Sequence, residues 1–137
     1  MHLSPLRNAH ALLTEALVFW ASQAEGAPLK RHLRSGVIQA FEFTYELSVR
    51  LTRRVLIERA ASTERVADLS FNDLLRAAAD AGLIQDAMRW REWREMRNAT
   101  SHAYAETIAQ AVAQRAAEFG ADAAALLVAL EANVERR

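Results

Sequence analysis

The sequence contains no cysteine, which excludes a disulfide framework and thiolate metal sites and is typical of a reducing compartment. The longest clean apolar run, residues 123–130, is far shorter than the roughly 20 residues that a helix needs to cross a bilayer. The first residues start a helix and lack a signal-peptide layout. The formal net charge is zero, so nucleic acid would have to bind through a local patch. These absences predict a cytoplasmic protein with no membrane association.

Glycine and proline are also scarce, with four and two copies, and strand-like alternation is absent over any useful length. Alanine, leucine, glutamate and arginine dominate, and all of them favour helices. A chain of 137 residues suffices for one domain with a real core. We therefore expect an all-α fold, an up-and-down bundle of four to five helices that forms one domain over residues 1–137.

Helix signals divide the chain into five helical segments. Ser4 is a favoured N-cap before Pro5, and the stop at residues 26–28 ends this first helix. A second helix is predicted over 29–59, a connection over 60–69, a short helix from the cap Ser70 to 81–82, another over about 85–96, and a last one from about 106 to the end. Gly120 is a possible kink in the last helix. Gly36 lies inside the second helix, where a close approach by another helix would explain it.

Residues 97–104 concentrate polar chemistry as no other segment does: a cation, an amide, two hydroxyls, an imidazole and a phenol. On an ideal helix Arg97 and His102 would point about 140° apart. If they act together, the helix must end or distort between them, or a second chain must supply one of them.

A second pattern crosses the same segment. Arg94, Asn98 and His102 recur at four-residue steps, with Arg91 one turn earlier, and this basic stripe suits a phosphate. An imidazole that moves protons and a guanidinium that stabilises charge can together cleave RNA without a metal. The plain alternative is a solvated basic face with a histidine near the helix end.

Two carboxylates one turn apart, Glu42 and Glu46, flank the aromatic cluster of the second helix. A carboxylate buried there needs a partner. We expect Glu46 to orient Arg97 or His102, and an ion pair with Arg50 or Arg53 is the structural alternative.

Several other residues are better explained by structure than by chemistry. Trp90 and Trp93 have helical spacing, which favours core positions over base stacking. Asp73 fits a helix cap better than an acid catalyst. The remaining histidines have no metal-ligand spacing, and we predict no metal and no cofactor. The chain has no Asp-x-Asp pair and no Walker loop, so it is not itself a nucleotidyltransferase.

Arg97-Asn98, Ser101-His102 and Tyr104 resemble the motif of HEPN-domain proteins: Arg, four residues, His, one residue, Tyr. The segment 36–47 resembles the second-helix signature of one HEPN branch, the nucleotidyltransferase substrate-binding proteins. Residues 81–84 and Trp90 continue that resemblance in the same order. It covers about 35–112, and three motifs in the right order make it fairly specific.

The resemblance implies a helical bundle that forms a homodimer, in which Arg97 and His102 of both protomers meet as catalytic residues of a metal-independent ribonuclease. Asn98 would support them. The residues themselves add Ser101 and Glu46 as supporting groups and Arg91 and Arg94 as ligands of RNA phosphates. A minimal nucleotidyltransferase would be the partner in a toxin–antitoxin pair and would transfer AMP to Tyr104.

Two other functions stay open. The same cleft can serve a non-catalytic subunit that binds a nucleotide or presents substrate to the nucleotidyltransferase. A plainer alternative is a helical adaptor whose polar segment only closes a dimer.

Overall fold

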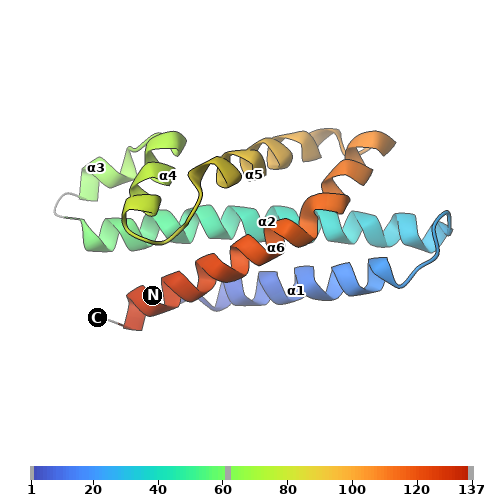
Figure 1. Ribbon diagram of the computed structural model, residues 1–137, viewed down its shortest axis with the longest axis horizontal. Helices are drawn as coiled ribbons and strands as arrows, with labels where there is room; N and C mark the ends of the chain where they lie inside the picture. Colours follow the sequence, from blue (N-terminus) through green and yellow to red (C-terminus); the bar gives the residue numbers. More distant parts are fainter. Residues whose placement is uncertain (1, 61–62, 136–137) are drawn as a thin grey trace.

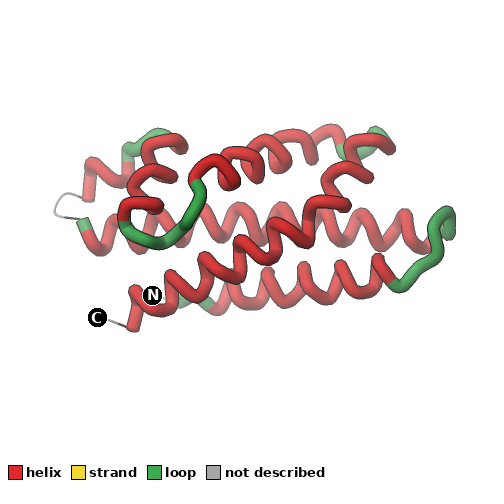
Figure 2. The backbone as a smooth tube through the Cα atoms, viewed as in Figure 1, coloured by secondary structure: helices red, strands yellow, loops and turns green. Residues whose placement is uncertain are grey.

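The computed structural model describes residues 2–60 and 63–135, and these residues form α-helices and turns without a strand (Figures 1 and 2). The predicted all-α fold is confirmed. The described residues contain six α-helices and one 3₁₀ turn: α1 (Ser4–Ala21), α2 (Pro28–Arg59), α3 (Thr63–Ala67), α4 (Phe71–Asp80), α5 (Ala87–Ala99), η1 (Thr100–His102) and α6 (Glu106–Glu135). The count exceeds four to five because the predicted connection over 60–69 holds the short helix α3.

Helix α2 runs along the whole bundle, and the other helices pack around it (Figure 1). Helix α1 lies on one side of it, and α3, α4 and α5 lie on the other, while α6 begins near the end of α5, crosses α2 and ends beside α1. The start of α6 follows directly on η1, so the polar segment 97–104 lies at the end of the bundle where α5 turns into α6.

Phe119 of α6 is the centre of the aromatic core. Its ring contacts Phe41 edge-on at 4.8 Å between centroids, Trp90 at 5.8 Å and Trp93 at 5.6 Å. All four side chains are buried. Edge-to-face aromatic pairs stabilise beyond the area they bury, by roughly 0.5–1.5 kcal/mol each. This cluster joins α2, α5 and α6, and it confirms that Trp90 and Trp93 are core residues.

The first helix differs from its prediction at both ends. Ser4 is the first helical residue and not the N-cap, because the buried Leu3 precedes it and accepts a bond from the Arg7 amide at 3.0 Å. The helix ends at Ala21, before the glycine stop. Residues 22–27 then form a turn in which Gly26 has a φ of +83°, a conformation that favours glycine.

The close helix approach predicted at Gly36 is wrong within this chain, because a Cβ added there would meet nothing within 4 Å. Helix α1 instead comes close at Gly120, where an added Cβ would lie 3.7 Å from Leu13. His10 Nε2 also donates to the Gly120 carbonyl oxygen at 2.9 Å. Helix α6 continues through Gly120 without a break.

None of the helices in residues 2–60 and 63–135 combines the length and the apolar character that a membrane span requires.

Candidate functional site

Helix α5 ends between Arg97 and His102, which is one of the alternatives that their joint action left open. The Thr100 hydroxyl donates to the Arg97 carbonyl oxygen at 2.6 Å, and the Ser101 hydroxyl donates to that of Asn98 at 2.9 Å. Such local side-chain bonds compete with the helical ladder. The chain therefore tightens at Thr100 into a 3₁₀ turn, which advances about 120° per residue. His102 thus lies on this turn and not on the α-helical stripe of Arg94 and Asn98.

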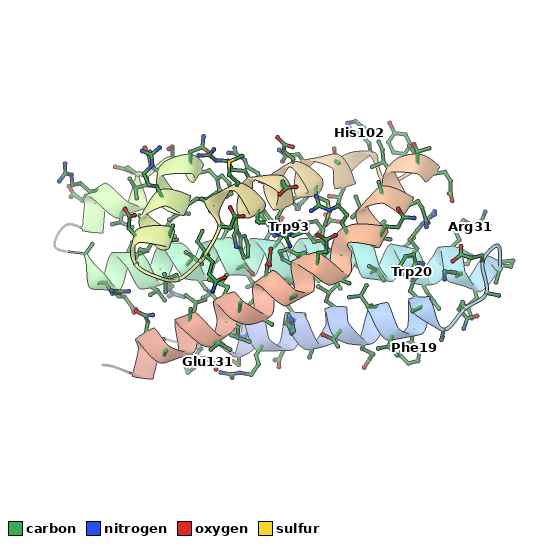
Figure 3. The ribbon with its side chains drawn as sticks, in the orientation of Figure 1. Phe19, Trp20, Arg31, Trp93, His102 and Glu131 are labelled. Atoms are coloured by element: carbon green, nitrogen blue, oxygen red, sulfur yellow. The ribbon has the colours of Figure 1, made fainter. Side chains whose placement is uncertain are left out.

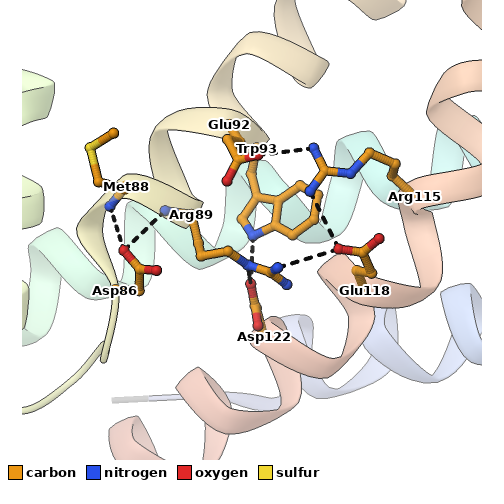
Figure 4. A network of polar contacts seen from close by, with 8 residues as sticks. All are labelled: Asp86, Met88, Arg89, Glu92, Trp93, Arg115, Glu118 and Asp122. Atoms are coloured by element: carbon orange, nitrogen blue, oxygen red, sulfur yellow. Dashed lines mark hydrogen bonds and ion pairs between the residues drawn. The ribbon is translucent and has the colours of Figure 1, made fainter.

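A polar network fixes helix α5 against α6 behind the site (Figure 4). Asp122 accepts bonds from the Trp93 indole nitrogen at 2.8 Å and from Arg89 Nε at 3.1 Å. The guanidinium groups of Arg89 and Arg115 lie 5.1 and 4.7 Å from the Trp93 ring. Arg115 of α6 also pairs with Glu92 of α5 at 3.3 Å. These contacts hold α5 at a set rotation, and Arg97 on α5 consequently faces α2.

Arg97 is held by two carboxylates of α2 and by its own helix. Its Nε and Nη2 donate to one oxygen of Glu46 at 3.1 and 2.7 Å, and Nη1 lies 3.2 Å from Glu42. Nη1 also donates to the Thr100 hydroxyl at 3.0 Å. The hydrogen bond to Glu46 and the charge of Glu42 raise the pKa of Arg97. The contact predicted between Glu46 and Arg97 is therefore present, and Glu42 shares it.

The structural alternative for Glu46 is wrong for Arg53. Arg53 Nη1 donates to the carbonyl oxygens of Val66 and Leu69, both at 3.0 Å, and so closes the C-terminal end of α3. No ion pair of the described residues involves Arg50.

Tyr45 of α2 is 7% exposed and lies close enough to Arg94 and Arg97 for their charges to act on its phenol. Burial raises the pKa of its phenol to about 12, although the positive charges of Arg94 and Arg97 oppose that shift. The phenol thus stays neutral at physiological pH and forms part of the wall beside Arg97.

His102 and Tyr104 stand at the outer end of the turn (Figure 3 labels His102). His102 Nδ1 and the Tyr104 hydroxyl are 3.3 Å apart, and the two rings meet edge-on at 5.9 Å. Tyr104 is 86% exposed. An imidazole in water and a phenol open to solvent are both accessible to a large substrate or a modifying enzyme.

Within the described residues no hydrogen bond, ion pair or ring contact joins Arg97 to His102. Arg97 faces the carboxylates of α2, whereas His102 pairs with Tyr104 at the tip of the turn. A single chain therefore holds the two residues close in sequence but does not bring their side chains into contact. Their joint action stays a prediction.

The other stripe residues are spread along the outer surface of α5. Arg94 is exposed and lies 4.6 Å over the Phe71 ring, Asn98 is exposed, and Arg91 Nη1 donates to the Met88 sulfur at 3.4 Å. None of these groups pairs with an acid in the described part of the chain.

Sequence reasoning missed the role of Thr100 and a second cluster around Arg34. A hydroxyl three residues after Arg97 was the available signal for Thr100. Arg34 is buried and donates to both oxygens of Glu106 at 2.7 and 2.8 Å, and to Gln110 at 3.1 Å. The sequence feature that could have identified Arg34 was its position: it is a cation one turn before Val37 on a helix face that is otherwise apolar.

The remaining predictions about single residues are settled by local contacts. Ser70 accepts from the Asp73 amide at 3.2 Å, so Asp73 belongs to a helix cap. Among the described residues no group of His, Asp or Glu side chains is arranged to hold a metal ion.

Comparison with known proteins places the chain among relatives of known family. Residues 1–132 match the family described as nucleotidyltransferase substrate binding protein like. A probable ribonuclease HepT of Haemophilus influenzae is 41% identical over 95 residues, which are 69% of this chain and 65% of that relative. The chain thus spans just under two thirds of that relative's length.

The fold also matches a solved structure from Haemophilus influenzae, described as a substrate binding domain of a nucleotidyltransferase. The TM-score is 0.86 at 34% identity, and the match covers 95% of this chain and 99% of the other.

Proposed function

Because this chain belongs to the family of nucleotidyltransferase substrate-binding proteins, as its motifs predicted, we propose that it is the HEPN-type partner of a minimal nucleotidyltransferase. We further propose that it is a cytoplasmic toxin that cleaves RNA without a metal, with Arg97 and His102 as catalytic residues. The observation that carries this proposal is the turn itself: a clamped guanidinium at its base and an exposed imidazole at its tip. The name of the HepT relative supports the same activity.

The chemistry is attack by a ribose 2′-hydroxyl on the adjacent phosphorus. His102 takes the proton of that hydroxyl and returns a proton to the leaving 5′ oxygen, which yields a 2′,3′-cyclic phosphate and a free 5′-hydroxyl. Arg97 stabilises the negative charge that grows on the phosphoryl oxygens. Asn98 and Ser101 shape the turn, and Glu46 positions Arg97.

A second copy of the chain completes this site. Arg97 and His102 of one protomer face different partners, so a phosphodiester gripped by both needs the twofold mate of at least one of them. An exposed turn at the end of the bundle leaves room for that copy, and a homodimer is the assembly that we propose.

Tyr104 is the proposed acceptor of AMP from the nucleotidyltransferase. Its hydroxyl is accessible and lies 3.3 Å from His102, so a phosphoryl group attached there would cover the imidazole. Modification at this oxygen would therefore silence cleavage. Intact-mass measurement after co-expression with the nucleotidyltransferase tests this, and a mass increment that Tyr104→Phe does not remove would contradict it.

The test of the catalytic proposal is His102→Ala, assayed with RNA in excess EDTA. Loss of a general acid–base group lowers cleavage by roughly 10²–10⁴-fold. His102 is exposed, so the fold and the urea midpoint should stay unchanged. Replacement of His32, an exposed histidine of α2, is the matched control. If His102→Ala cleaves as fast as the parent, the catalytic proposal fails.

A specific observation supports the second candidate, a non-catalytic subunit that binds a nucleotide. A cavity of about 210 Å³ lies at the turn between α1 and α2, and the Trp20 ring, Lys30, Arg31 and Arg34 line it. Lys30 sits 5.0 Å from the Trp20 ring centre (Figure 3 labels Trp20 and Arg31). Lys30 pairs with Glu25 at 2.9 Å and Arg34 pairs with Glu106 at 2.7 Å, and both acids also line the cavity. Arg31 is thus the lining cation without an ion pair among the described residues, and a cation near an aromatic ring suits a phosphate-bearing ligand.

The two candidates separate in one experiment. Purified protein in EDTA that leaves RNA intact but binds AMP or ATP, with binding lost in Arg31→Gln, would favour the non-catalytic subunit. Cleavage that depends on His102 and is indifferent to Arg31 would favour the ribonuclease.

A further inference from the structure

A groove of about 580 Å³ follows the exposed side of α2 from the Arg97 site toward α3. Its lining residues are Tyr45, Glu46, Val49, Arg50, Arg53, Arg54 and Ile57. The groove begins at Glu46, which bonds Arg97, and at Tyr45, whose phenol feels the charges of Arg94 and Arg97. It is therefore continuous with the proposed site of cleavage.

The residues that line this groove carry an excess of positive charge. Its single carboxylate, Glu46, is already committed to Arg97, while three arginines line the rest. Arg53 is not available to a ligand, because its guanidinium donates to backbone carbonyl oxygens at the end of α3 and holds that end of the groove in place. Arg50 and Arg54 are exposed, and neither pairs with an acid in the part of the chain that the structure describes. Two cations are consequently available to an anion.

The spacing of these two cations suits a polymer. Arg50 and Arg54 are four residues apart, so they share one face of α2 and are separated by about 6 Å along its axis. The half-buried side chains of Val49 and Ile57 flank them and give the groove an apolar part. Phosphates can meet the arginines while base faces cover Val49 and Ile57, and a positively charged groove that follows the phosphate backbone binds single-stranded nucleic acid without sequence preference.

We infer that the groove over Tyr45, Val49 and Ile57 binds the strand of single-stranded RNA that flanks the cleaved bond, with Arg50 and Arg54 each contacting one phosphate. This inference rests on the proposed function for the identity of the ligand. It assigns to α2 the task of holding the substrate, and it leaves the reaction to the turn after α5. A neutral protein thereby acquires an RNA site through a local excess of charge.

The experiment measures binding without cleavage. A fluorescein-labelled 2′-O-methyl RNA 12-mer has no free 2′-hydroxyl, so the full-length protein binds it and cannot cut it by the proposed route. Fluorescence anisotropy at several KCl concentrations gives the Kd and its salt dependence. Each phosphate contact on a single strand contributes about 0.7 to the slope of log K against log salt.

Arg50→Gln/Arg54→Gln should lower that slope by about 1.4 and weaken binding about 25-fold at 0.1 M salt, since two contacts are lost. The matched control is Arg7→Gln/Arg76→Gln, which removes the same charge from α1 and α4, where each arginine pairs with a nearby acid. The control should leave the slope unchanged.

Equal slopes for both double variants would overturn the inference. So would an unchanged slope together with a changed monomer–dimer equilibrium in sedimentation, which would make a second copy the occupant of the groove. The outcome is independent of the His102→Ala test. If the groove binds RNA but the protein does not cleave it, only the ribonuclease proposal is refuted. If cleavage depends on His102 but the Arg50 and Arg54 substitutions do not change RNA binding, only this inference is refuted.

Discussion

The clamp on Arg97 predicts a measurable coupling between Arg97 and Glu46. Arg97 makes two bonds to a single oxygen of Glu46, the shorter at 2.7 Å. The Arg97 side chain is 29% exposed and that of Glu46 is 46% exposed. A hydrogen bond to a charged group is worth about 1.5–3 kcal/mol when buried, and exposed ion pairs typically contribute 0.2–1 kcal/mol. At this exposure we expect a coupling of about 1 kcal/mol.

A double-mutant cycle tests that figure. The free energy of unfolding in urea is measured for the parent, Glu46→Gln, Arg97→Gln and the double variant. With a urea m-value of about 2 kcal/mol/M, a coupling of this size moves a midpoint by roughly 0.5 M. The coupling should shrink at 1 M salt, where the Debye length is only about 3 Å.

The control cycle uses Arg7 and Glu131, a pair at 3.0 Å whose side chains are 55% and 35% exposed. We expect no more than about 0.5 kcal/mol there. A coupling between Arg97 and Glu46 no larger than the control would refute the clamp. If Glu46 positions Arg97 for cleavage, Glu46→Gln should also lower kcat about tenfold while KM stays nearly constant, and a purely structural role would change neither.

Three further predictions concern the wall behind the site. Tyr45 has a pKa raised from its ordinary value to about 12, so its contribution is fully present below pH 10 and is lost as the pH rises through 12. The parent should therefore lose up to about 2.7 kcal/mol over that window in urea titrations, and Tyr45→Phe should lack this loss. Phe119→Ala should lower the free energy of unfolding by about 3–5 kcal/mol, and a change below 1 kcal/mol would contradict the central place of its ring. Asp122→Ala leaves the Trp93 indole N–H without its acceptor, so it should cost about 1–3 kcal/mol and raise amide exchange at the end of α5.

Much of the fold was predictable because the helix signals are local. The absence of strand patterns, the cap at Ser70 and the proline at the start of α2 depend only on neighbouring residues. The boundaries were less predictable. The burial of Leu3, which precedes the first helical residue, and the short helix α3, whose end Arg53 closes, depend on contacts with distant parts of the chain.

The candidate site was likewise predictable in part. The resemblance of the motif identified Arg97, His102 and Tyr104. The angle between the first two left open whether the helix ends, distorts or relies on a second chain, and the helix does end between them, at Ala99. The partner of Arg97 was foreseen only as one choice among several, since many helix rotations bring a carboxylate of α2 near α5.

By itself, the sequence determined the helical class and the segment that carries the polar chemistry, because these follow from composition and spacing along one chain, and the resemblance of its motifs indicated the family. Tertiary structure alone decided that Glu42 and Glu46 both clamp Arg97, that Gly120 and not Gly36 faces another helix, and that Arg50 and Arg54 pair with no acid among residues 2–60 and 63–135. The physical reason is that these outcomes depend on the rotation of one helix against the next. That rotation is set by the packing around Phe119 and by the bonds of Asp122, and no local pattern encodes it.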